Sequence, residues 1–198
     1  MLADGQSLVI WDYLNYSQYI QAYVWWTYVA SRLGGVGGYG LAFDQAGDPA
    51  AIDAFLQAEL GQGLAQTQLD MLTAAWLQEP TGIRGFEGMF QLDGQPQVAT
   101  APPAQLLPFT GVFLPASANG LSPIGAGTDV VHRGALTGSA PDLAAPFDVN
   151  GGVVIALNAN QDPDSTTEQS SGTLAASFTA SQPGPVAARA KPSNAELW

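Results

Sequence analysis

The sequence predicts an α+β protein with three parts: an N-terminal helical module, a β-sandwich or jelly-roll-like domain, and an extended C-terminal arm. All six tyrosines and three of the five tryptophans lie in the first 39 residues, on a segment nearly free of charge. Beyond residue 82, Gly, Pro, Thr and Val increase, and short strand-like runs alternate with turn signals. Near the C-terminus, repeated prolines disfavour regular helix or central strand. We place the three parts at residues 1–82, 83–181 and 182–198.

Residues 7–33 predict one long helix, because no charge falls between Asp12 and Arg32 and a glycine-rich run follows. On a helical wheel, most of the aromatic side chains share one broad face and the amide side chains lie mostly opposite. This apolar girth exceeds what one neighbouring layer covers, so we expect it to contact a neighbouring subunit or a membrane. The predicted interface comprises Trp11, Tyr13, Tyr16, Tyr19, Ile20, Tyr23, Val24, Trp25, Trp26 and Tyr28, with Trp198 as an anchor at the end of the arm.

Two shorter helices complete the helical module. One is predicted to begin at Asp48-Pro49, where Asp48 caps the helix and Pro49 takes its first position. The other covers residues 64–78 and ends at Pro80-Thr81-Gly82. The strand candidates that follow are residues 86–92, 97–100, 106–114, 129–136, 147–150, 152–157 and 173–180. About seven short strands of this kind are typical of a sandwich or jelly roll.

Gly35-Val-Gly-Gly-Tyr-Gly40 matches the letters of the dinucleotide fingerprint, but that motif needs a preceding strand and a following helix. Here the predicted long helix precedes it, so a hinge is the better interpretation. The single histidine, His132, lies in a predicted strand, and the sequence contains no Gly-x-Ser-x-Gly nucleophile elbow. Without cysteine, thiolate catalysis and sulfur-ligated zinc are excluded. We predict no catalytic residues and no cofactor.

A loop that follows a predicted strand contains alternating oxygen-bearing side chains, Asn158, Asn160, Asp162 and Asp164, with Glu168 close behind. Such side chains can wrap a hard cation such as calcium. Pro163 stands where the EF-hand loop needs glycine, and no Glu closes the loop at its twelfth position. A solvated polar loop is therefore favoured over a cation site, for which Asp162, Asp164 and Glu168 are the candidates.

Seventeen carboxylates against five cations give a net charge of −12. Phosphate backbones are bound by clustered Lys and Arg, so direct nucleic-acid binding is not expected. The N-terminal residues carry no positive charge, which argues against a secretory signal. Only 11% of the residues are charged, and charge is what keeps ordinary surfaces from associating.

These features predict a non-enzymatic structural subunit of a large ordered assembly, of the kind found in phage and virus particles. Its partners would be copies of itself or other subunits, held by burial of the aromatic helix. One alternative is a membrane-associated accessory subunit anchored by residues 7–33. A second alternative is a small hydrolase or carbohydrate-binding protein that uses the β domain. A simple buried core helix and a stacking platform for sugars or bases remain alternatives for the aromatic segment itself.

Overall fold

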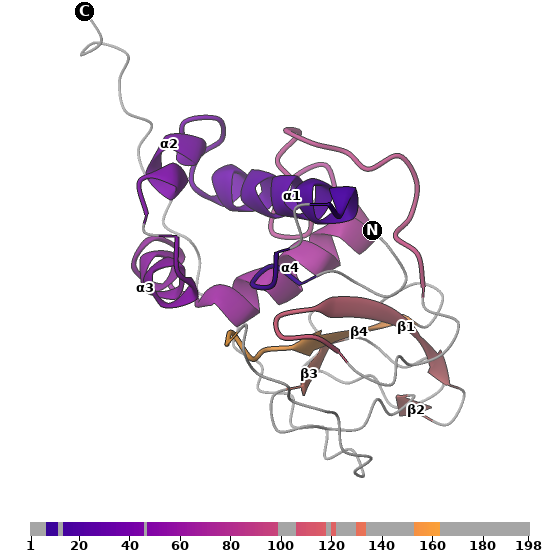
Figure 1. Cartoon of the computed structure of the whole chain (residues 1–198). Helices are drawn as coiled ribbons and strands as arrows, with labels where there is room; N and C mark the ends of the chain where they lie inside the picture. Colours follow the sequence, from indigo (N-terminus) through magenta and orange to yellow (C-terminus); the bar gives the residue numbers. More distant parts are fainter. Residues whose placement is uncertain are drawn as a thin grey trace, which may run out of the picture.

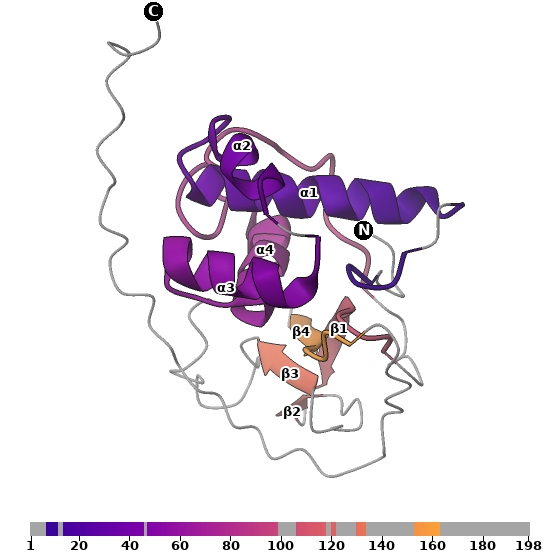
Figure 2. The ribbon, with the colours of Figure 1, turned by 60° about the vertical axis from the view of Figure 1, so that its left-hand side comes forward.

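The computed structural model describes residues 7–11, 14–45, 47–98, 106–117, 120–121, 130–133 and 153–162. These residues form layers that are visible in two views (Figures 1 and 2): α1 (Tyr16–Arg32) lies over α4 (Leu64–Leu77), and α4 lies over a small antiparallel sheet. Helix α4 is therefore the middle layer, and its residues from Thr67 to Ala75 are all buried.

Helix α1 begins at Tyr16, nine residues after the predicted start. Its N-cap is Asn15, whose side-chain oxygen accepts a hydrogen bond from the Ser17 amide at 3.1 Å. Ser7 has a different role, because it forms an isolated antiparallel bridge with Thr110 and its hydroxyl oxygen accepts from the amides of Val9 and Ile10. The predicted helix over residues 7–33 is thus too long at its N-terminal end.

The glycine-rich run ends α1, as the sequence predicts, with Gly34 and Gly35 both at positive φ. The run does not act only as a hinge, because it continues into a short helix, α2 (Gly38–Phe43). Gly38 packs directly against α1: a Cβ atom placed on it would lie 2.8 Å from the Ala30 carbonyl oxygen. The missing side chain therefore allows α2 to lie close against α1 (Figure 2).

The other two helices follow their predicted boundaries closely. Helix α3 (Pro49–Leu60) has Pro49 at its start, and the Asp48 carboxylate accepts a hydrogen bond from the Ala51 amide at 2.9 Å, so the predicted cap is confirmed. Helix α4 starts after Gly63, and its Leu64 amide donates to the Asp53 carboxylate of α3 at 2.6 Å. This contact ties the two helices together at the turn between them.

The strands are β1 (Gly111–Ser117), β2 (Gly120–Leu121), β3 (Val130–Arg133) and β4 (Val153–Asn158), in the order β2-β1-β4-β3. All neighbouring pairs are antiparallel. In the central pair Phe113 lies opposite Ile155, and Gly111 lies opposite Leu157. A Cβ on Gly111 would collide with the Leu72 side chain of α4, so glycine at this position lets the helix approach the sheet.

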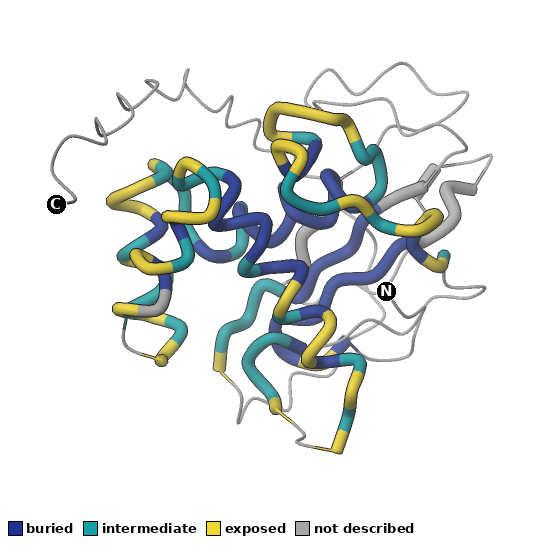
Figure 3. Tube along the Cα trace, turned by 90° about the horizontal axis from the view of Figure 1, so that it is seen from above, coloured by how far each residue is buried: buried dark blue, intermediate teal, exposed yellow. Residues whose placement is uncertain are grey.

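One hydrophobic core joins the helices to the sheet. Figure 3 shows the buried residues concentrated in the centre of the described chain, with exposed residues at its rim. The core includes Val24, Trp25, Tyr28 and Val29 of α1, Leu69, Met71, Leu72, Ala74 and Ala75 of α4, and Phe113, Ile155 and Leu157 of the sheet, together with Leu56, Leu64, Phe86 and Phe109. Residues on both sides of the predicted boundary at residue 82 therefore share this core.

The middle layer also buries polar side chains. Asp70 accepts hydrogen bonds from Gln62 and Gln66, each at 2.9 Å, and the Thr73 hydroxyl donates to the Leu69 carbonyl. Within the described part of the chain, both amide atoms of the fully buried Gln68 lack a hydrogen-bond partner. An unpaired buried amide costs free energy, so Gln68 is a weak point of this layer.

Only some of the predicted strands are strands in the structure. Residues 86–92 form no strand: Glu87 and Gly88 make a turn at positive φ, and the residues around them are irregular. The strand predicted at residues 106–114 begins five residues later and extends to Ser117. The candidates at residues 147–150 and 173–180 lie outside the described residues. The second sheet of a sandwich would have to come from such segments, so the sandwich or jelly roll stays a prediction.

Candidate interaction surface

The N-terminal half of α1 presents its aromatic side chains to solvent and turns its amides inward. Tyr16 is 76% exposed and Tyr23 is 55% exposed, whereas Gln18 and Gln21 are only 6% and 3% exposed. The Gln18 side chain is satisfied inside, because its amide nitrogen donates to the Ile10 carbonyl at 2.9 Å. The amphipathic pattern that the sequence predicts is present, but its orientation is inverted relative to an ordinary core helix.

The exposed side chains form one continuous surface. Tyr16, Tyr19, Ile20 and Tyr23 follow the three- and four-residue spacing that places them on one stripe of the helix. Trp11 joins this stripe through an edge-to-face contact with Tyr19, with ring centroids 4.8 Å apart. We call this surface the aromatic face, and it comprises Trp11, Tyr16, Tyr19, Ile20 and Tyr23, all of which are exposed.

A chain of ring contacts connects the aromatic face to the core. Tyr23 meets Phe90 edge to face at 5.8 Å, Phe90 meets the buried Phe86 at 5.4 Å, and Phe86 meets Tyr28 at 5.7 Å. Phe90 is itself half-buried. These contacts hold the base of the aromatic face in place, so its outer rings are presented on a firm support.

Toward the C-terminal end of α1, the side chains on this stripe become small and buried. They are those of Thr27, Ala30 and Ser31. Here α2 covers the helix: Gly38 packs against Ala30, and the Thr27 and Tyr39 hydroxyls lie 2.6 Å apart. The chain thus covers the small-residue half of the stripe itself and leaves the aromatic half open.

The predicted interface is therefore narrower than the sequence suggests. Val24, Trp25 and Tyr28 are buried in the core of their own chain, because they lie on the side of α1 that faces α4 and the loop after it. Trp26 is partly buried and packs edge to face on Trp25 at 4.7 Å. Tyr13 and Trp198 lie outside the described residues. Leu14, just before the first turn of α1, is also exposed, although it is not among the predicted interface residues.

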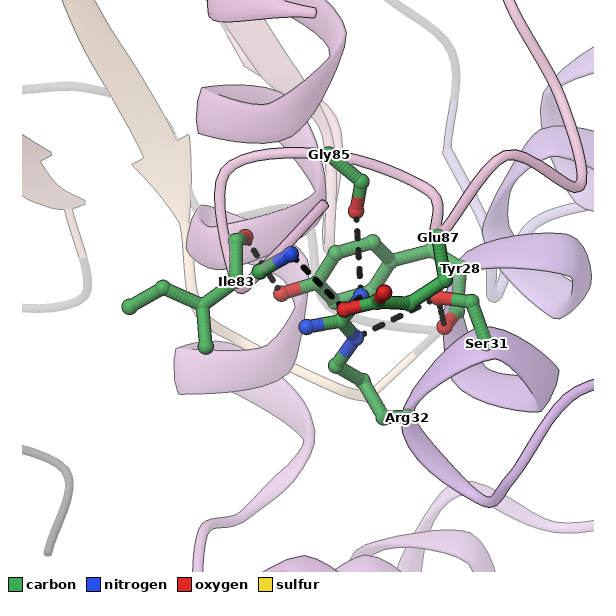
Figure 4. Close-up of polar contacts among 7 residues, drawn as sticks. Tyr28, Ser31, Arg32, Ile83, Gly85 and Glu87 are labelled. Atoms are coloured by element: carbon green, nitrogen blue, oxygen red, sulfur yellow. Dashed lines mark hydrogen bonds and ion pairs between the residues drawn. The ribbon is translucent and has the colours of Figure 1, made fainter. Parts of the chain in front are cut away.

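A polar cluster fixes the C-terminal end of α1 to the loop after α4 (Figure 4). The Arg32 guanidinium donates to the Glu87 carboxylate at 3.1 Å and to the Gly85 carbonyl at 3.3 Å, and it lies 5.3 Å from the Tyr28 ring centre. The Tyr28 hydroxyl donates to the Ile83 carbonyl at 3.0 Å. All these groups bond to one another within the chain, so the cluster stabilises α1 and offers no evident chemistry.

The other candidate sites find little support. Asn160 and Asp162 donate their amides to the side chains of Asn158 and Asn160, and the Asn158 side chain is buried and donates to the Leu106 carbonyl. Asn158 therefore holds the loop together. Asp164 and Glu168 lie outside the described residues, and within the described ranges no three His, Asp or Glu side chains gather as a metal site would need. The His132 backbone pairs with Ala156 in the sheet.

One form of the membrane alternative, a spanning anchor, needs a helix that is long and apolar enough to cross the bilayer. Among the helices of the described residues, none combines the length and the apolar character needed to cross a bilayer.

Comparison with known proteins finds no relative: no family model, no curated protein and no solved structure matches the chain.

Proposed function

We propose that this chain is a non-enzymatic structural subunit of a large ordered assembly, most concretely a capsid or capsid-associated protein of a virus or phage particle. The observation that supports this proposal is the inversion of α1. This helix buries glutamines and exposes tyrosines, so its apolar side is left uncovered by the described residues and is available to a partner. Copies of the chain or other subunits of the assembly are the proposed partners.

The size of the aromatic face suits a contact between subunits. Its five side chains keep between 37% and 76% of their surface exposed. At about 150–250 Å² for a large side chain, these fractions amount to roughly 500 Å². Each partner in a standard protein interface contributes about 800 Å². The face alone therefore supplies more than half of one side of a specific interface.

The distribution of charge also supports a contact between subunits. The aromatic face has no charged side chain, although the whole chain carries −12. Depletion of charge at the centre and enrichment of Tyr and Trp are the composition of interface cores. The surrounding acidic charge would keep free subunits soluble and disfavour binding to an anionic bilayer or to nucleic acid.

The test is the native mass in solution of the double variant Tyr16→Ser/Ile20→Ser, measured by light scattering after size exclusion. We expect the unaltered chain to form a stable multimer without detergent. The variant should lose roughly 3–5 kcal/mol per contact, enough to dissociate it at micromolar concentration, because two large side chains no longer become buried. The melting temperature of the variant should fall only by the part that association contributes, since both side chains are exposed in the subunit.

The matched control is Val36→Ser/Leu107→Ser, which removes two equally exposed apolar side chains outside the aromatic face and should keep the multimer. A monomeric unaltered chain would overturn the proposal. The membrane alternative is tested with neutral phosphatidylcholine vesicles. Suppose that the unaltered chain binds these vesicles, that the Tyr16→Ser/Ile20→Ser variant does not, and that no multimer forms in solution. The aromatic face would then have a membrane-surface role in place of the assembly role.

A further inference from the structure

The open half of the α1 stripe ends where α2 begins to cover it. At this junction Thr27 contacts Tyr39 of α2, and Tyr23 one turn earlier is exposed. An occupant of the aromatic face would therefore lie along α1 in line with α2. From Tyr16 to Tyr23 the open stripe is roughly 10 Å long at about 1.5 Å per residue. A short stretch of chain is sufficient to cover it.

The chemistry of the face favours an extended, proline-rich occupant. Tyrosine and tryptophan rings spaced along a surface are the usual binding sites for polyproline II segments, whose proline rings pack on the aromatic rings. A polyproline II backbone has no internal hydrogen bonds, so its carbonyls can accept from tyrosine hydroxyls and the indole N–H. Trp11, Tyr16 and Tyr23 provide this combination of flat rings and donors on one face, and Tyr19 adds a further ring.

The chain itself carries a segment with the matching composition. Residues 183–198 contain Pro183, Pro185, Pro192 and the terminal Trp198. Their side chains include Arg189 and Lys191, two of the five cations in the sequence, and one carboxylate, Glu196. Residues 1–182 carry the other three cations and sixteen carboxylates, so the side-chain charge is −13 there and +1 in the arm.

We infer that residues 183–198 of a neighbouring copy dock on the aromatic face, with proline rings or Trp198 against Tyr16, Tyr19 and Tyr23. This inference rests on the proposed assembly function and names the contact that builds it. As polyproline II, sixteen residues extend about 50 Å at roughly 3.1 Å each, far more than the open stripe needs. The excess length is what an arm requires to reach from one subunit to the next.

A second copy of α1 suits the face less well than the arm does. The carbonyls along a helix are bonded within it and offer nothing to the tyrosine hydroxyls. Pairing two α1 helices would also bring two strongly acidic bodies together, whereas the arm brings cations. The arm therefore satisfies both the polar and the apolar groups of the face.

Site-specific photocrosslinking in the full chain tests the inference. Benzoylphenylalanine placed at Tyr16 keeps an aromatic ring on the face, and the same probe at Val36, equally exposed but off the face, is the matched control. We expect irradiation of the first sample to give a product of twice the chain mass on a denaturing gel. Mass spectrometry should map its second end to residues 183–198. Linkage within one chain, or to another α1, would overturn the inference.

A second measurement separates this inference from the proposed function. The variant Trp198→Ala and the double variant Pro183→Ala/Pro185→Ala should each weaken association at least tenfold in sedimentation velocity. A synthetic peptide of residues 183–198 should compete for the same face and dissociate the multimer. If both variants assemble as tightly as the unaltered chain, the arm is not the occupant and the assembly proposal still stands. If the unaltered chain is monomeric, the assembly proposal itself fails.

Discussion

Gly38 allows α2 to lie over the C-terminal half of α1. A Cβ at this position would meet both the Ala30 carbonyl oxygen and the Leu33 Cβ at 2.8 Å. A backbone oxygen and a Cβ atom are fixed by the backbone and cannot rotate away, so relief requires α2 to move outward. Gly40, two residues further along the same helix, faces open space, because no atom lies within 4 Å of the point that a Cβ would occupy.

The substitution Gly38→Ala should therefore reduce the free energy of unfolding by about 1–3 kcal/mol, the usual cost of overpacking. Gly40→Ala is the control, and it should be neutral or stabilising by about 0.5–1 kcal/mol because alanine suits a helix better than glycine. Urea unfolding followed by circular dichroism measures both. Equal effects of the two substitutions would show that α2 does not lie against α1 as described.

The arginine at the end of α1 ties two elements together. Arg32 is mostly buried, bonds to Gly85 and Glu87, and lies near the helix C-terminus, where a positive charge is favourable. Replacing it by methionine keeps the aliphatic stem and removes the guanidinium. We expect Arg32→Met to lower the free energy of unfolding by about 1–2 kcal/mol, since hydrogen bonds to charged groups are lost.

Hydrogen exchange supplies the more specific measurement for Arg32→Met, because the amides of residues 82–89 should lose protection while those in the middle of α1 keep theirs. Arg84→Met is the matched control. Its ion pair with Glu79 spans 3.5 Å between two side chains that are each more than a third exposed, so its loss should change stability by less than about 0.5 kcal/mol. Similar losses in both variants would argue that Arg32 acts only as a surface charge.

At the level of elements, the sequence is most informative where local signals decide the structure. Helix α3 begins at Pro49 because Asp48 supplies a cap that needs no distant partner. The start of α1 is different: Ser7 bonds near Thr110, about a hundred residues away, and no local pattern indicates that pairing. The turn at Glu87 is likewise fixed by contacts with Arg32 and Gly82.

The aromatic face, too, is predictable from the sequence where local spacing decides it and unpredictable where distant contacts do. The aromatic stripe and its spacing are readable from the sequence, but the direction in which it faces is not. A helical wheel shows which residues share a side but not which side is buried, and the buried position of Gln18 depends on an acceptor at Ile10 outside the helix. Val24 and Trp25 lie on a different side of α1 from this stripe, and they belong to the core because α4 lies against that side.

The described chain behaves as one packing unit, because α4 contacts α1 on one side and the sheet on the other (Figure 1). Phe113 of β1 connects these layers: it is fully buried, and its ring lies 5.4 Å from that of Trp76 in α4. A substitution that lowers the stability of the sheet is therefore expected to lower the stability of the helices as well.

The substitution Phe113→Ala should cost about 3–5 kcal/mol and should lower the helical and the tertiary signals together. Far-ultraviolet circular dichroism and tryptophan fluorescence, recorded on the same thermal unfolding curve, measure the two. Leu107→Ala, at an exposed position, is the control and should stay within about 0.5 kcal/mol of the unaltered chain. A helical signal that persists after the fluorescence change would indicate two independent modules.

The position of Trp11 gives the molecule a built-in optical reporter. Its indole stands at the rim of the aromatic face against Tyr19, half in contact with water, whereas Trp25 is sealed in the core. Any molecule that covers the face must dehydrate this indole. Its emission would then shift to shorter wavelength and resist acrylamide quenching, so partner capture can be followed in dilute solution without attaching a dye.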